Sequence, residues 1–300
     1  MLLSQNAMAV RMAKYRLPEA LERDIAELAE FIAGDYFPNS AIEPAAIAHN
    51  KEITISANSY GDGFDGMIEH RSGRFHIYLN LDRVETVKSP RARFTLCHEL
   101  GHYFIDDHRN ALRSGETPAH PSKCEFESNN PVEVQADYFA SSLLLPESRI
   151  RKFARKQHSG LATILAVARH FNASVTSASV RFSTLELQQS VLVKWKDGQV
   201  QWMRASPTVW ANGYRKTIGS LSALPEECAT RMAMSQNPST ADFHESTTVS
   251  SQWFPFVSES SLQSNVILRE QSVRLGRFGG VTLLTAESGQ FPKVGFGWHT

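Results

Sequence analysis

The chain has 300 residues, 42% of them hydrophobic and 21% charged, a composition that is typical of globular proteins and excludes disordered and coiled-coil chains. Its 31 basic and 31 acidic residues balance, so net charge favours neither nucleic acid nor a membrane as a partner. Cys97, Cys124 and Cys228 form no CxxC pair and are too few for a disulfide framework, which indicates a reduced, cytoplasmic protein. No apolar run is long enough for a signal peptide or a membrane helix.

Helices and short strands alternate in the first half of the chain. Apolar residues at helical spacing predict a helix over residues 18–34 and a short one over 43–50. Apolar residues then alternate between positions 53 and 81, which predicts three short strands. Further helices are predicted over 90–105 and 131–146, with a long polar loop between them.

The helical pattern continues as two short helices over 161–187 and stops near residue 190. VLVKW, KDGQ and VQWM then indicate a strand, a turn and a strand, and the rest of the chain is predicted to be mostly β. All five tryptophans lie in 190–300, which suits a packed core or, alternatively, a pocket for a ligand or partner. The sequence therefore predicts an α+β protein with a second, β-rich domain.

The motif HELGH, residues 98–102, carries the strongest chemical signal. Because residues four apart share one face of a helix, His98 and His102 can bind one metal ion. Two imidazoles and one further ligand suit zinc, although Mn2+ or Fe2+ can occupy the same donors. Glu99 points beside the metal, where it can take a proton from metal-bound water. The motif therefore predicts a hydrolase site with one zinc ion per chain.

The third metal ligand has several candidates. His108 stands at the spacing of an HExxHxxGxxH motif, but Ile105 replaces the glycine that turns the chain back, so we expect His108 in a loop or on the surface. His120 lies in the predicted loop and has little support. Glu133 opens the next helix and Asp137 follows one turn later. We expect Glu133 to bind the metal and Asp137 to accept an imidazole N–H; the alternative is an ordinary acidic helix start.

Two stretches resemble the ImmA/IrrE family of zinc metallopeptidases: RARFTLCHELGHYF at 91–104 and EVQADYFASSLLLP at 133–146. The similarity covers about residues 20–187 and includes a helix-turn-helix-like segment, HFNASVTSASVRF. The resemblance implies a zincin-like fold and cleavage of a transcriptional repressor in a stress- or mobile-element-linked response. It assigns His98, His102 and Glu133 as zinc ligands and Glu99 as catalytic base.

On this basis we predict a zincin-like metallopeptidase domain over 1–158, a helix-turn-helix-like segment over 159–189, and a β-rich C-terminal domain over 190–300 with a regulatory or sensory role. The strand at 75–80 is expected to form a sheet edge that binds an extended peptide by strand addition. Tyr103 and His120 are candidates for stabilising the oxyanion.

A basic stretch overlaps the helix-turn-helix-like segment, since positions 149–181 carry seven basic residues and no acidic one. Nucleic acid or an acidic partner protein could bind there. DNA contact is not favoured, because the second helix offers one basic residue and its apolar spacing suits packing. The candidates are Arg151, Lys152, Arg155, Lys156, Arg169 and Arg181.

The sequence thus favours a cytoplasmic zinc metalloendopeptidase acting on a protein substrate, a DNA-binding repressor. The alternative is a DNA- or protein-binding regulatory module with a catalytically silent zinc site. Glu99 disfavours this alternative, because a structural zinc site needs no base.

Overall fold

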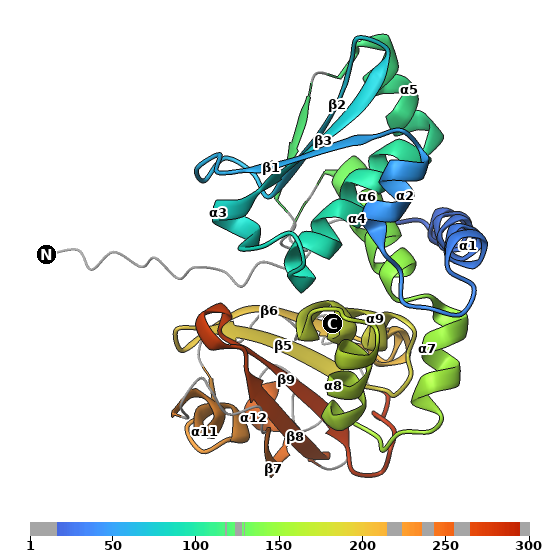
Figure 1. Ribbon diagram of the computed structural model, residues 1–300. Helices are drawn as coiled ribbons and strands as arrows, with labels where there is room; N and C mark the ends of the chain where they lie inside the picture. Colours follow the sequence, from blue (N-terminus) through green and yellow to red (C-terminus); the bar gives the residue numbers. More distant parts are fainter. Residues whose placement is uncertain are drawn as a thin grey trace, which may run out of the picture. The chain divides into compact units, whose positions relative to one another are not determined.

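The computed structural model describes residues 17–117, 119–123, 128, 130–214, 224–235, 243–254 and 265–294. These residues form two compact units, the first made of residues 17–155 and 167–177, and the second of 156–166 and 178–294. Both units mix helices with a β-sheet, so the predicted α+β class is confirmed (Figure 1). The described residues contain no helix that is both long and apolar enough to cross a membrane.

The first unit contains most of the helices. Its elements are α1 (Glu19–Tyr36), α2 (Pro44–Asn50), β1 (Thr54–Asn58), β2 (Gly66–Arg71), β3 (Arg74–Asn80), α3 (Leu81–Val84), α4 (Pro90–Phe104), α5 (Asp106–Ser114), β4 (His120–Ser122), α6 (Pro131–Leu144) and α7 (Glu147–Ala154). Helices α8 (Leu161–His170) and α9 (Val175–Thr184) are divided between the two units. The region expected to be one long loop therefore contains the helix α5 and the short strand β4.

The four strands of this unit have the order β1-β3-β2-β4, with β1 parallel to β3 and the other pairs antiparallel. The expectation that the strand at 75–80 is an edge is wrong, because β3 pairs with β1 on one side and with β2 on the other. Strand order depends on contacts between distant segments, which local alternation does not report. The edges of this sheet are β1 and β4.

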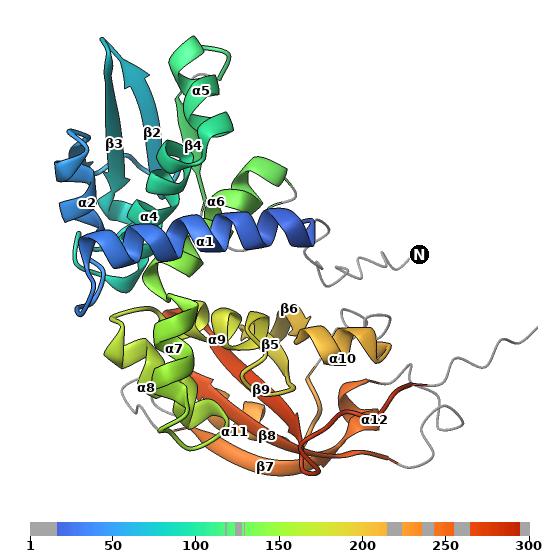
Figure 2. The same ribbon diagram turned by 90° about the vertical axis from the view of Figure 1, so that its right-hand side faces the viewer.

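Helix α4 packs on the sheet, α6 packs on α4, and the two helices carry the candidate site (Figure 1). Each begins at a proline preceded by a capping residue: the Ser89 side chain accepts from Ala92 N, and Asn130 accepts from Val132 N. Helix α1 packs along α6, and Figure 2 shows it crossing this pair of helices.

One glycine explains why α4 and α6 lie so close together. A Cβ atom added to Gly101 would lie 3.2 Å from Ala136 Cα, so a larger residue would push the two helices apart. The two small residues thus bring the motif on α4 into contact with the acidic residues on α6.

The second unit is built on an antiparallel sheet of order β6-β5-β9-β8-β7. Its elements are β5 (Val191–Lys196), β6 (Gln199–Ala205), α10 (Pro207–Ala211), α11 (Ala229–Ser235), β7 (His244–Val249), α12 (Ser250–Trp253), β8 (Ile267–Arg274), the 3-10 turn η2 (Gly276–Phe278) and β9 (Gly280–Ala286). The predicted β-rich C-terminal region is therefore confirmed, with three short helices that the strand pattern did not indicate.

Aromatic residues fill the core of the second unit. Trp195, Tyr214, Trp253 and Phe254 are buried there together with aliphatic residues. Glu270 is also buried, and accepts hydrogen bonds from the Thr230 backbone N–H and hydroxyl at 2.8 Å. Burial raises the pKa of the Glu270 carboxyl. Of the five tryptophans, Trp298 lies outside the described residues.

Candidate metal centre

His98, His102 and Glu133 converge on one point between α4 and α6. Their ligand atoms all lie within 4.8 Å of one another, and all three residues are buried. The Nε2 atoms of the two histidines are 3.2 Å apart, and Glu133 places one carboxylate oxygen 3.3 Å from His98 Nε2 and the other 3.4 Å from His102 Nε2. Two imidazole nitrogens and a carboxylate oxygen in this arrangement could hold a divalent metal ion and leave a coordination position open.

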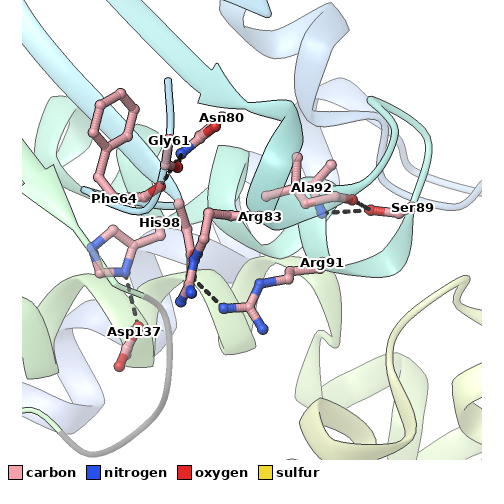
Figure 3. Close-up of polar contacts among 11 residues, drawn as sticks. Gly61, Phe64, Asn80, Arg83, Ser89, Arg91, Ala92, His98 and Asp137 are labelled. Atoms are coloured by element: carbon pink, nitrogen blue, oxygen red, sulfur yellow. Dashed lines mark hydrogen bonds and ion pairs between the residues drawn. The ribbon is translucent and has the colours of Figure 1, made fainter. Parts of the chain in front are cut away.

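Asp137 lies one turn beyond Glu133 on α6 and contacts the other side of His98. Its Oδ1 atom is 2.8 Å from His98 Nδ1 (Figure 3). An ionised carboxylate can only accept a hydrogen bond, so His98 Nδ1 carries the proton and donates a hydrogen bond to Asp137. Nε2 is then free of a proton and available as a metal ligand.

Burial keeps His102 in its neutral form. The pKa of His102 falls to about 3, chiefly because burial penalises the imidazolium, while the hydrogen bond with Glu133 acts in the opposite direction. Metal binding requires a neutral imidazole, so this environment suits a ligand. The donor set therefore fits a bound divalent cation.

Glu99 is fully buried on α4, against the first residue of β2. A Cβ atom added to Gly66 would lie 2.7 Å from Glu99 Oε1 and 2.4 Å from the Thr95 methyl group. The absence of a side chain at Gly66 therefore lets the strand approach the carboxylate. Glu99 therefore follows the candidate ligand His98 on α4 and lies against the start of β2.

The structure corrects the expectation for His108. We expected a loop or surface histidine, but the His108 side chain is only 6% exposed and its ring centroid lies 5.2 Å from that of His102. Helix α4 ends at Phe104 and α5 begins at Asp106, so the chain changes direction at Ile105, where backbone ψ is 116°. The expectation that His108 lies in a loop or on the surface was therefore wrong.

Comparison with known families agrees with this arrangement. Residues 56–183 match the Peptidase_M78 family model, described as an IrrE N-terminal-like domain. This part of the chain is therefore similar to an IrrE N-terminal-like domain. The resemblance found in the two helical motifs is thereby confirmed. A solved structure of a Mycobacterium tuberculosis transcriptional regulator has a similar fold, with a TM-score of 0.55, 14% identity and 88% of each chain covered. No curated protein matches the sequence.

Within the first unit, a buried carboxylate fixes the start of β2. Asp65 is fully buried and forms ion pairs with Arg83 at 2.9 Å and with Arg91 at 2.6 Å. Its backbone N–H donates to the carbonyl of Ser122 in β4. Because Arg91 lies in the first turn of α4, these ion pairs join the strand that contacts Glu99 to the helix that carries it.

The loop before Asp65 is held in the same region. The Asn80 side-chain amide donates to the carbonyl of Gly61 at 2.5 Å and to that of Phe64 at 2.8 Å (Figure 3). Nothing in the local sequence of this glycine- and aspartate-rich segment indicates more than a turn. Its role in placing β2 depends on Asn80 and on the two arginines, which are distant in sequence.

Of the two oxyanion candidates, Tyr103 is the one whose side chain the structure describes. The Tyr103 ring packs edge-on against Phe75 at 5.1 Å and lies under the Arg109 guanidinium. The side chain of His120 lies outside the described part of the chain, although its backbone belongs to β4.

The candidate basic residues fall into two groups. Arg181 is 1% exposed, so its candidacy for contact with nucleic acid or a partner protein is wrong, because a buried guanidinium is not available at the surface. The local count of basic residues does not reveal which of them face inward. The other candidates are at least partly exposed, and Arg151 forms an ion pair with Glu147 at 2.7 Å. They are Arg151, Lys152, Arg155, Lys156 and Arg169.

Proposed function

We propose that this protein is a zinc-dependent metalloendopeptidase that cleaves a DNA-binding repressor in a stress- or mobile-element-linked response. The observation that carries the proposal is the convergence of His98, His102 and Glu133 within 4.8 Å, with Glu99 buried beside them. A site that only stabilised the fold would need no buried carboxylate next to its ligands. The proposed location is cytoplasmic.

Each residue of the site has a definite task in this proposal. His98, His102 and Glu133 hold the ion, and Asp137 fixes the His98 tautomer through its 2.8 Å contact. Bound zinc would supply a Lewis acid that polarises the scissile carbonyl and acidifies water. Glu99 accepts the proton of the attacking water and delivers it to the leaving amine. Burial of Glu99 keeps bulk water from competing for that proton.

Peptide substrates would bind at the edge strand β4. This strand pairs with β2 opposite Gly66, the residue that abuts Glu99, and β4 has no further strand partner among the described residues. An extended peptide can add to such an edge through main-chain hydrogen bonds. Edge binding places a peptide bond near the base without requiring a particular side chain.

The test compares wild type with two variants of the full chain, Glu99→Gln and Glu133→Ala. After equilibration with zinc and gel filtration, mass spectrometry should give about one zinc per chain for wild type and for Glu99→Gln, and much less for Glu133→Ala. Each protein is then added to an extract of the source cells, and new N-termini are identified by mass spectrometry. Wild type should generate new N-termini in a DNA-binding protein and Glu99→Gln should not. Loss of zinc from wild type, or equal cleavage by Glu99→Gln, would contradict the proposal.

The second candidate is a regulatory module that binds DNA or protein and has a catalytically silent metal site. The observation in its favour is the exposed basic set, to which Lys152 contributes from α7 and Arg155 and Lys156 contribute from the residues just after it. Full regulatory function of Glu99→Gln in cells, together with salt-dependent DNA binding, would select this candidate.

A further inference from the structure

One buried histidine beside the candidate metal centre has no task in the mechanism above. His108 is contributed by α5, not by either of the helices that carry the ligands. It is 6% exposed and lies against His102, with 5.2 Å between ring centroids. Glu133 is close enough to act on the ring electrostatically. His108 therefore belongs to the immediate surroundings of the site.

His108 is not one of the convergent donors. Among the described residues, the group whose ligand atoms lie within 4.8 Å of one another comprises His98, His102 and Glu133. The His108 ring therefore flanks the three candidate ligands and does not add a fourth one. The space beside the donors is where the reacting part of a substrate must lie.

The hydrogen-bonding capacity of the His108 ring exceeds what its described neighbours supply. An imidazole has two ring nitrogens, and in His108 both are buried without a hydrogen-bond partner among the described residues. Leaving a buried polar group without a partner is costly, so an arrangement of this kind is best explained by a ligand that completes it.

We propose that His108 is a catalytic residue that donates a hydrogen bond to the substrate carbonyl oxygen and stabilises the oxyanion as the carbonyl is attacked. The proposal rests on the proposed peptidase function. Its chemistry is that of a preorganised donor, which strengthens its bond as negative charge develops on the oxygen. Tyr103, the candidate that α4 contributes, packs against Phe75 and Arg109.

The test uses cobalt-loaded full chain and acetohydroxamate, a small metal-binding anion whose oxygen stands in for the oxyanion. His108→Phe keeps a ring of similar shape without a donor, His108→Asn restores a donor, and Tyr103→Phe is the matched control. Cobalt affinity is measured by competition with a chromophoric chelator, and acetohydroxamate affinity by the change in the cobalt absorption bands.

For His108→Phe we expect cobalt affinity within threefold of wild type and acetohydroxamate affinity about ten- to a hundredfold weaker, as for loss of one hydrogen bond to a charged group. His108→Asn should recover part of this loss, and Tyr103→Phe should bind like wild type.

Unchanged acetohydroxamate binding in both His108 variants would overturn the assignment. So would an equal loss of cobalt affinity, which would make His108 a residue that positions the ligands. If wild type itself bound no metal, the proposed function would fail, and that result is distinct from the other two. If His108→Phe does not fold, the Asn variant alone decides the matter through the same two affinities.

Discussion

Asp137 Oδ1 lies 2.8 Å from His98 Nδ1, and it reaches that atom from the same helix that supplies the carboxylate of Glu133. One helix therefore provides both a candidate ligand and the group that orients the neighbouring imidazole. The spacing of one helical turn places the two carboxylates on either side of His98.

Asp137→Asn should weaken zinc binding by about ten- to a hundredfold, because an amide does not hold the His98 tautomer as a carboxylate does. Competition with a chromophoric chelator measures the affinity. Glu147→Gln, which removes a half-exposed carboxylate from α7, is the control and should bind zinc like wild type. An Asp137→Asn protein with wild-type affinity would show that Asp137 does not act on the metal site.

The metal-free protein should lose stability on acidification. His102 has a pKa of about 3 in the folded chain and about 6.5 when unfolded, so the unfolded state binds more protons between these values. Unfolding is therefore favoured as the pH falls below about 6.5, by about 2 kcal/mol from this group between pH 7 and 5. His108, with a pKa of about 4, acts in the same direction.

Hydrogen exchange of peptides from α4 and α6 is the appropriate measurement. All five tryptophans lie in 190–300, so their fluorescence reports the second unit and serves as an internal control. His102→Gln should reduce the pH dependence of exchange in α4. A pH dependence as steep as that of wild type would show that His102 is not the group responsible.

Gly66→Ala should impair the site. The new methyl group would lie 2.4 Å from the Thr95 side chain and 2.7 Å from Glu99 Oε1, so β2 or α4 must move. We expect a loss of about 1 to 3 kcal/mol in the free energy of unfolding. We also expect a marked fall in the proposed cleavage of substrate by this protein. Gly63→Ala, with no atom within 4 Å of the added methyl group, is the matched control. Equal behaviour of the two variants would argue against close packing of β2 on Glu99.

Asp65→Asn should destabilise the first unit by about 3 kcal/mol or more, because Arg83 and Arg91 lose a fully buried partner. Urea unfolding followed by circular dichroism measures the loss. Glu147→Gln breaks a half-exposed pair and should cost less than about 1 kcal/mol. If both variants unfolded at the same urea concentration, the buried ion pairs would not be what holds β2.

The sequence was informative where the determinants are local. Helical spacing and the flanking prolines predicted α1, α4 and α6 to within a few residues, and the i, i+4 rule brought His98 and His102 together. Glu133 and Asp137 were found because they also follow helical spacing on α6. The roles of these residues in binding and catalysis stay predictions.

Features that depend on distant contacts were missed. Strand order placed β3 in the middle of the sheet, and the change of direction at Ile105 buried His108. The second unit contains α10, α11 and α12, which have 5, 7 and 4 residues and are therefore too short for a helical pattern to be recognised in the sequence. Arg181 was counted as a surface charge because nothing in its local sequence indicates that it is buried.

The guanidinium of Arg93 brings three distant segments together. It is 5% exposed, and donates to both carboxylate oxygens of Glu43 at 3.0 Å, to the carbonyl of Ile42, and to the carbonyl of Asn172 at 3.1 Å. Asn172 follows Arg93 by 79 residues, on the far side of a stretch that belongs to the other unit. During synthesis, the hydrogen bond from Arg93 of α4 to the Asn172 carbonyl can therefore form only after residue 172 has been added to the chain. A ribosome-bound chain halted before residue 172 should hold α4 in a protease-sensitive form that matures once the α8–α9 turn has emerged.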